Sequence, residues 1–314
     1  IPVVRENWAA HYDSVRITDK KVKIILDELD KAGELDNTIV FFFSDHGYKG
    51  LRHKQFCYDG GTHVPFLIRW YGNEDALKPA RRNDLVNLID VPATSLALAG
   101  LPIPDSMEGK NLFAADYHRN YVISVRDRCD FTIDRIRSVR TKKYRYIKNF
   151  MDRPMMQPHY RDHRLEYLAM EKYYNKGEMT PAQEFLWQDE RPDEELYDIE
   201  NDPHEINNLA ADSAYASVMN KMRKILNDWI ERTGDQGQIS ETETPTGRAN
   251  LQDMLERWGP RCVNPEYDAI RKNPPVSGKP GVRLHNPGKQ DVDLDKMNRS
   301  RDYTLKALYN AKQM

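Results

Sequence analysis

The sequence predicts an α/β fold, because a helix, a strand, a loop and a second strand follow one another in its first part. Residues 5–32 carry apolar side chains at helical spacing, and Gly33 follows in the position of a C-cap. Two apolar runs of strand length come next, Ile39 to Phe43 and Val64 to Trp70, with a polar loop between them. The spacing therefore predicts a layered domain with its functional loop at the end of the first strand.

Beyond this region the sequence predicts another helix and then a small antiparallel sheet. The helix is expected to begin at Asp90 as N-cap, with Pro92 in its first turn, and to end at Gly100. Short runs of alternating polarity predict the sheet. Its expected strands are Tyr121–Val125, Ile133–Val139, Lys143–Ile147 and Glu195–Asp198. A helix is also expected near residues 164–175.

One more helix is indicated by an apolar stripe, which we interpret as core packing. The stripe consists of Met219, Met222, Ile225, Leu226 and Trp229. The whole pattern divides the chain into three parts. Residues 1–118 form part of an α/β domain, and residues 119–235 a small subdomain of antiparallel sheet plus helix. Residues 236–314 are rich in Pro, Gly, Asn and Lys and predict an extended, partly irregular tail.

Composition excludes some classes of protein. The formal net charge is -2 with 31% charged residues, so nothing indicates nucleic-acid binding. Mean hydropathy is -0.80, and no apolar run approaches the ~18–20 residues that a membrane span needs. The three cysteines, Cys57, Cys129 and Cys262, form neither a disulfide framework nor a zinc spacing, so each is expected to be a buried or idle thiol. No signal peptide opens the chain at Ile1, which reads as mid-protein sequence.

The loop after the first strand holds the residues that indicate chemistry. Asp45 offers a hard carboxylate oxygen and His46 an imidazole nitrogen, the ligand types of a divalent cation. Lys54 could neutralise a tetrahedral anion as a point charge. The glycines of the turn at residues 58–61 would let backbone approach the site closely. A turn with an N-cap remains the alternative for an Asp-His-Gly sequence in this position.

Several motifs together resemble the sulfatases of the alkaline phosphatase superfamily. They are residues 36–47 (DNTIVFFFSDHG), 54–65 (KQFCYDGGTHVP), 86–101 (VNLIDVPATSLALAGL), 106–112 (SMEGKNL), 194–209 (EELYDIENDPHEINNL) and the helix ending at 229–235 (WIERTGD). The resemblance covers roughly residues 5–235 in consistent order, and residues 136–140 and 146–150 look most like the bacterial heparan N-sulfatase-like and arylsulfatase-like branch. It implies the C-terminal part of an alkaline-phosphatase-like sandwich with a small antiparallel C-terminal subdomain.

The resemblance also implies roles for individual residues. Asp45 and His46 would be ligands of a divalent cation, expected to be Ca²⁺, and Lys54 would contact the sulfate and the leaving-group oxygen. His53 and His63 flank the same loop and could touch substrate. Asp59 replaces the glutamate that is commoner at this position, and either shapes the turn or contacts substrate. The implied activity is formylglycine-dependent hydrolysis of sulfate esters or sulfamates.

Two family elements are missing from these 314 residues. The family's nucleophile arises from a Cys/Ser-x-Pro-x-Arg motif, and none of the three cysteines lies in such a motif. The paired aspartates that complete the family's metal site are missing as well. We therefore expect the formylglycine to lie upstream, the chain to be a fragment, and the chain alone to be inactive. The parent would then be periplasmic or extracellular if it is bacterial.

Two other functions stay open from the sequence. His46 suits a transition metal better than asparagine would, which favours a phosphodiesterase or phosphonate monoester hydrolase of the same superfamily. A non-catalytic relict binding protein is the other alternative. The substrate class implied by the resemblance is a sulfated small molecule or glycan such as a glycosaminoglycan. The basic and aromatic segment 135–163 could face such a polyanion, or it could be a solvated sheet face.

Overall fold

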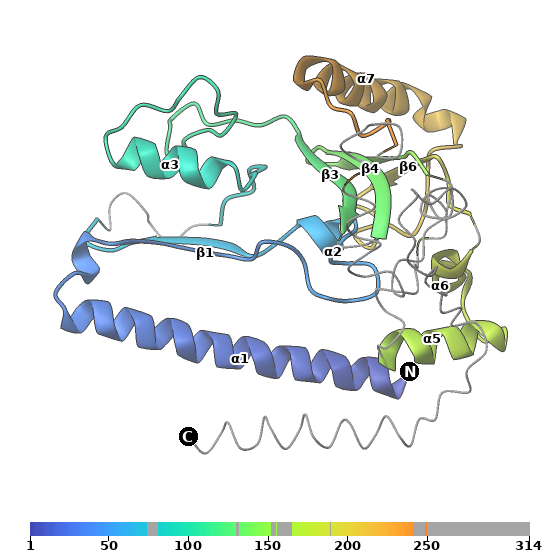
Figure 1. The fold of residues 1–314 in the computed structure, drawn as a ribbon, viewed down its shortest axis with the longest axis horizontal. Coiled ribbons are helices and arrows are strands. Elements are labelled where there is room, and N and C mark those ends of the chain that lie inside the picture. Colours follow the sequence, from blue (N-terminus) through green and yellow to red (C-terminus); the bar gives the residue numbers. More distant parts are fainter. Residues whose placement is uncertain are drawn as a thin grey trace.

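The computed structural model describes residues 1–73, 81–129, 132–151, 155, 165–188, 190–240 and 249. Its elements form two parts. One is a two-stranded hairpin with a long helix below it, and the other is a four-stranded sheet with a helix above it (Figure 1). The alternation of helix and strand in the first part and the antiparallel sheet in the second confirm the predicted α/β class. The three-part division of the chain stays a prediction, and its tail lies almost entirely outside the described residues.

The first part consists of helix α1 and a hairpin. Helix α1 spans Pro2–Lys31, and the Gly33 amide, at φ +70°, closes its end by donating to the Asp30 carbonyl. Strands β1 (Ile39–Phe43) and β2 (Phe66–Trp70) pair antiparallel. The second strand begins two residues later than expected, after a proline that has no N–H to give to the ladder.

The outer surfaces of this part are unusually apolar. No residue of α1 is buried. Large apolar side chains stand exposed along α1 and on both strands: Tyr12, Val15, Ile17, Ile24, Ile25, Phe42, Phe43 and Leu67. Exposed apolar side chains that gather into a patch mark an interaction surface more often than an ordinary face. Within the described parts of the chain, no helix is long and apolar enough to cross a membrane.

Helix α3 (Asp90–Leu98) corrects one local prediction. Its N-cap is Ile89, so the expectation that Asp90 caps the helix is wrong. Asp90 is instead fully buried, and its carboxylate pairs with Arg119 and accepts the Tyr117 hydroxyl at 2.8 Å. A buried charged partner binds a carboxylate more strongly than a helix terminus does, which explains the difference. Gly100, at φ +72°, ends the helix as expected.

The second part is an antiparallel sheet in the order β3-β4-β5-β6. Its strands are β3 (Val122–Cys129), β4 (Thr132–Arg140), β5 (Tyr144–Asn149) and β6 (Glu194–Asp198). The smaller helical elements are η1 (Leu35–Asn37), α2 (Asp59–Thr62), α5 (Leu165–Asn175), α6 (Pro181–Glu184), η2 (Phe185–Trp187) and η3 (Ser213–Tyr215). The four predicted strands and the helix predicted near residues 164–175 are confirmed.

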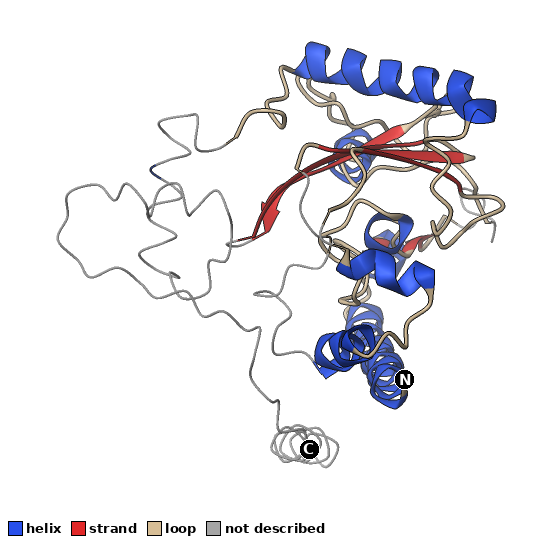
Figure 2. Ribbon diagram, turned by 90° about the vertical axis from the view of Figure 1, so that its right-hand side faces the viewer, coloured by secondary structure: helices blue, strands red, loops and turns tan. Residues whose placement is uncertain are grey.

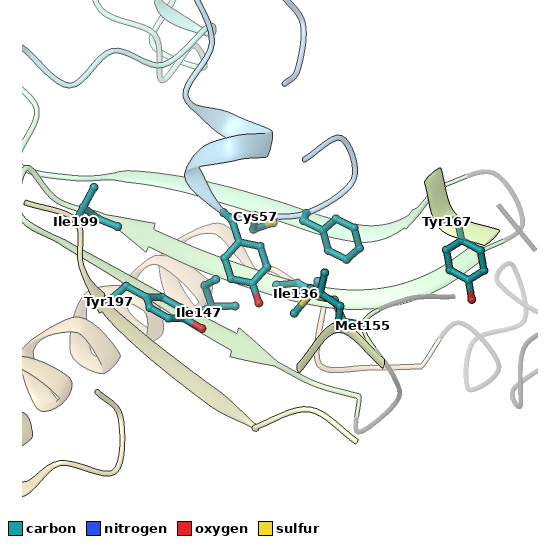
Figure 3. Close-up of a cluster of buried hydrophobic side chains, with 10 residues drawn as sticks. Cys57, Ile136, Ile147, Met155, Tyr167, Tyr197 and Ile199 are labelled. Atoms are coloured by element: carbon teal, nitrogen blue, oxygen red, sulfur yellow. The ribbon is translucent and has the colours of Figure 1, made fainter. Parts of the chain in front are cut away.

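The two faces of this sheet bury different partners. Helix α7 (Ala216–Thr233) covers one face, with Met219, Met222 and Leu226 each no more than 2% exposed, so the predicted core stripe is confirmed (Figures 1 and 2). The opposite face packs against the loop that precedes and enters α2 (Figure 3). Consecutive residues of β5 divide between the faces, with Tyr146 toward α7 and Ile147 toward the loop.

Candidate active site

The loop after β1 is held against α2 by glycines. The Gly47 amide donates to the Gly61 carbonyl at 2.9 Å, and the Ser44 hydroxyl donates to the His46 carbonyl at 2.6 Å. A Cβ on Gly47 would lie 1.9 Å from the Gly60 carbonyl oxygen, so only glycine fits there. The backbones at Gly47 and Gly60 thus lie close together, and the expectation that the turn glycines let backbone approach the site itself stays a prediction.

Asp45 and His46 stand together at the carboxyl end of β1. His46 Nε2 lies 3.5 Å from Asp45 Oδ2, and the Asp45 side chain is 83% exposed. His46 Nδ1 lies 3.0 Å from the Gly47 carbonyl oxygen, which can only accept. Nδ1 can form this hydrogen bond only as the donor, so the bond to the Gly47 carbonyl requires a hydrogen on Nδ1.

The two side chains do not by themselves complete a calcium site. Calcium takes six to eight oxygen ligands. Across the part of the chain that the structure describes, no group of three or more His, Cys, Asp or Glu side chains could hold a metal ion. Asp45 and His46 supply one carboxylate and one imidazole nitrogen as a pair, so no chemical step is assigned to a metal here.

A cavity of about 1210 Å³ brings most of the predicted site residues together. Asp45, His46, Lys54, Asp59 and His63 all line it. They come from the loop after β1 and from the segment that ends in α2, and strand β3 closes another side. Two carboxylates, two imidazoles and an ammonium group therefore surround one cavity, and the ammonium group suits the binding of an anionic ligand.

His53 lies elsewhere. It is not among the residues that line this cavity, and its ring packs at 6.0 Å from that of Trp8 and 5.8 Å from that of Tyr48. It also supports Gly60, whose added Cβ would come within 2.8 Å of the His53 ring. The structure thus separates His53 from the other residues that the sequence grouped with it.

Asp59 begins α2 and faces two arginines of the sheet. It pairs with Arg140 at 2.9 Å and with Arg145, and His63 Nδ1 lies 3.5 Å from its carboxylate. Burial acts to raise the pKa of Asp59, but hydrogen bonds from His63 and Arg140 and the charge of Arg145 outweigh it and hold that pKa well below its usual range. Asp59 therefore stays ionised and ties the turn to the sheet.

Glu205 completes this cluster, and sequence reasoning missed it. It is only 3% exposed, its Oε1 lies 2.8 Å from Arg145 Nε, and its Oε2 accepts the Asp59 amide at 2.8 Å. Its own backbone adopts φ +54°, a left-handed conformation that a non-glycine residue keeps only when its surroundings enforce it. Burial raises the pKa of Glu205 to about 7, although the charge of Arg145 opposes this.

Glu205→Gln is expected to remove a pH-dependent part of the stability. The pKa of Glu205 is about 7 in the folded protein against 4.5 for an unperturbed glutamate, so its stabilising contribution is largest below about pH 4.5 and is lost as the pH rises through 7. The Tm difference between wild type and variant, measured from pH 5 to 8, should shrink as the pH rises. A constant difference over this range would mean that Arg145 keeps Glu205 ionised throughout.

The basic segment divides between the interior of the sheet and the cavity. Arg137 and Arg145 are each 1% exposed, so at these positions the segment does not form a solvated surface. Arg140 and Arg145 line the cavity, and the expectation that the segment faces a glycan stays a prediction. Arg137 binds Asp235 through both Nε and Nη2 at 2.9 Å. The later basic and aromatic residues of the segment, Arg153, Tyr160 and Arg161, lie outside the described residues.

The prediction of an idle thiol is confirmed for Cys57. It is a free cysteine, 4% exposed, and burial raises its pKa to about 11. A thiol with a raised pKa is a poor nucleophile at neutral pH. The side chain of Cys129 and the whole of Cys262 lie outside the described residues.

Comparison with known proteins places the chain among the sulfatases. The sulfatase family model matches residues 4–101. An ulvan-active sulfatase of Formosa agariphila is 32% identical over 249 residues, which is 77% of this chain and 41% of that protein. Human N-sulphoglucosamine sulphohydrolase is 27% identical over 272 residues, which is 74% of this chain and 49% of that protein.

A solved sulfatase structure is also similar to this chain. The crystal structure of a 2-O GAG sulfatase is similar to 69% of this chain and 41% of its own, with a TM-score of 0.50 and 25% identity. The fold is therefore that of the alkaline phosphatase superfamily. Within it, the chain belongs to the sulfatase family. It spans about half or less of the length of the curated relatives named above.

Proposed function

We propose that residues 1–314 belong to a sulfuric ester or sulfamate hydrolase that acts on a sulfated sugar. The observation that carries the proposal is the meeting of Asp45, His46 and Lys54 around one cavity at the end of β1. The relatives add support for the substrate class, since one acts on ulvan by name and another is named for N-sulphoglucosamine.

In this proposal each residue has a separate task. The Lys54 ammonium neutralises the sulfate and assists the departing oxygen, and His63 contacts the substrate from the same cavity. His53 is a weaker candidate for contact, because it does not line the cavity. Asp45 and His46 supply two ligands to a divalent cation, for which we favour Ca²⁺, and the cation would add positive charge beside the bound sulfate.

The proposal includes a nucleophile from outside residues 1–314. We infer that a formylglycine and the remaining metal ligands come from another segment of the complete protein, and that this chain alone is inactive. Two facts support the inference: the chain matches 41% of the length of the ulvan-active relative, and apolar side chains stand exposed on α1, β1 and β2. We also propose a periplasmic or extracellular location, where polymeric sulfated glycans are accessible.

The complete reading frame, co-expressed with a formylglycine-generating enzyme, provides the test. Sulfate release from para-nitrophenyl sulfate and from glucosamine N-sulfate is expected, with faster turnover than of para-nitrophenyl phosphate. Preference for phosphate or phosphonate esters would favour the phosphonate hydrolase alternative, which His46 suits as a transition-metal ligand. Absence of turnover on all of these substrates by folded, formylglycine-bearing protein would favour a non-catalytic protein.

A further inference from the structure

The segment that carries Lys54 does not fix its own shape. Between residues 51 and 62 its regular structure is the single turn of α2. Gln55, directly after Lys54, has φ +81°, which is unfavourable for a residue with a Cβ. The Gln55 carbonyl accepts Arg126 Nη1 of β3 at 3.0 Å. Contacts from the sheet therefore impose the conformation next to Lys54.

Arg145 of β5 makes the largest share of these contacts. Its Nη1 donates to the Cys57 carbonyl at 2.6 Å, and its Nη2 donates to the Thr62 hydroxyl at 3.0 Å. Its Nη2 also pairs with Asp59, and its Nε lies 2.8 Å from Glu205 Oε1. One buried guanidinium thus binds the second half of this segment at three points, directly after the stretch that carries Lys54.

Glu205 holds the same segment from a second side. Its carboxylate accepts the Asp59 amide, the first of α2, and its carbonyl accepts Arg52 Nη2 at 2.6 Å. Arg52 Nη1 also donates to the His204 carbonyl at 2.9 Å. Figure 1 shows α2 lying against the sheet to which these contacts reach. Charged groups that are buried in this way keep their geometry, because each lost partner would leave an unpaired charge.

We propose that Arg145 is a positioning residue of the active site, which holds the segment 51–62 so that Lys54 and His63 face the cavity. Arg145 borders the cavity but is only 1% exposed, and it acts through the backbone at Cys57, the carboxylate of Asp59 and the hydroxyl of Thr62. The catalytic consequence rests on the proposed sulfatase function. The structural part of the proposal does not depend on that function.

Arg137 provides a matched control for Arg145. Both arginines are 1% exposed in the same sheet, and both are ion-paired. The ion-pair partners of Arg137 are Asp127 and Asp235, and its Nη1 donates to the carbonyls of Arg126 and Ile136, so these contacts lie outside the segment 51–62. Lysine at either position keeps the charge and removes the planar fork, so Arg145→Lys and Arg137→Lys make equivalent chemical changes in different places.

The first measurement uses Cys57 as a reporter and needs no catalytic activity. The buried thiol is labelled with iodoacetamide, and peptide mass spectrometry follows the modification of Cys57. Arg145→Lys should speed labelling about tenfold, the factor expected for losing one hydrogen bond to a charged group, while Arg137→Lys should not. Thr62→Val, which removes the hydroxyl that accepts from Arg145 and donates to the Tyr58 carbonyl, should give a smaller rise, and Thr62→Ser, which keeps the hydroxyl, should not. Equal labelling rates in wild type, Arg145→Lys and Thr62→Val would overturn the proposal.

The second measurement uses the complete enzyme, well below its melting temperature. Arg145→Lys should lower kcat by up to about 100-fold, as small misplacements of a catalytic group do, with a smaller change in KM. Arg137→Lys should keep both constants within about twofold of wild type. Equal losses in the two variants would assign Arg145 a general structural role and overturn the proposal. If the wild type itself shows no sulfatase activity, the proposed function fails, and the labelling experiment still decides the role of Arg145.

Discussion

Lys54→Ala is expected to lower the kcat of the complete enzyme on sulfate esters by about 100- to 1,000-fold, the range for losing one group that stabilises developing negative charge. Lys54 lines the cavity that also holds Asp45 and His46, so its ammonium is placed to neutralise a bound sulfate. Because the interaction strengthens as the leaving oxygen gains charge, kcat should fall more than KM rises. Steady-state kinetics on para-nitrophenyl sulfate measure both constants.

Lys49→Ala is the control for this prediction. Lys49 belongs to the same loop, is exposed, and is not among the residues that line the cavity. It should keep kcat near that of wild type, and circular dichroism should show both variants folded. Unchanged kcat in folded Lys54→Ala protein would remove Lys54 from the mechanism.

Asp45→Asn is expected to impair metal-dependent activity about as severely as Lys54→Ala impairs turnover. The amide keeps the shape of the side chain but removes the charge, which is the main attraction of a carboxylate for a hard cation. The Ca²⁺ concentration for half-maximal activity should rise by more than the roughly 10–100-fold that loss of a supporting outer contact causes. Titration of EDTA-stripped enzyme with Ca²⁺, followed by sulfate release, measures this shift.

Asp36→Asn serves as the control for Asp45→Asn. Asp36 lies in the turn before β1, at the other end of the same strand, and it is exposed. Its replacement should leave the calcium titration unchanged. If Asp45→Asn titrates like wild type, Asp45 is not a ligand, and the alternative of a simple turn at Asp45, His46 and Gly47 would gain support.

Local sequence patterns were sufficient to predict most of the elements. Alternation identified the strands of the second sheet, and helical spacing identified the stripe of α7 that buries Met219, Met222 and Leu226. These predictions succeeded because the periods of strand and helix depend on neighbours within a few residues. The grouping of Asp45, His46 and Lys54 could be predicted for a similar reason, since all three lie close together in one loop.

The sequence alone could not predict which polar residues become buried. Asp90 looked like an ordinary helix cap, and Arg137 and Arg145 looked like surface charges, yet all three are buried and ion-paired. The partners of these residues lie far away along the chain, as the hydrogen bond between Arg137 and Asp235 illustrates. Whether a charged side chain can be buried depends on its partners, and a local sequence pattern does not show which residues those partners are.

By itself the sequence determined the family, the order of helices and strands, and the loop at the end of β1 that carries Asp45, His46 and Lys54. Only the tertiary structure decided how that loop is held, by joining Asp59, Arg145 and Glu205 into one buried cluster. The physical reason is that backbone periodicity is a property of neighbouring residues. Pairing of buried charges, by contrast, depends on segments that are distant in the sequence. The segments that carry Asp59, Arg145 and Glu205 pair only when the folded chain brings them together away from water.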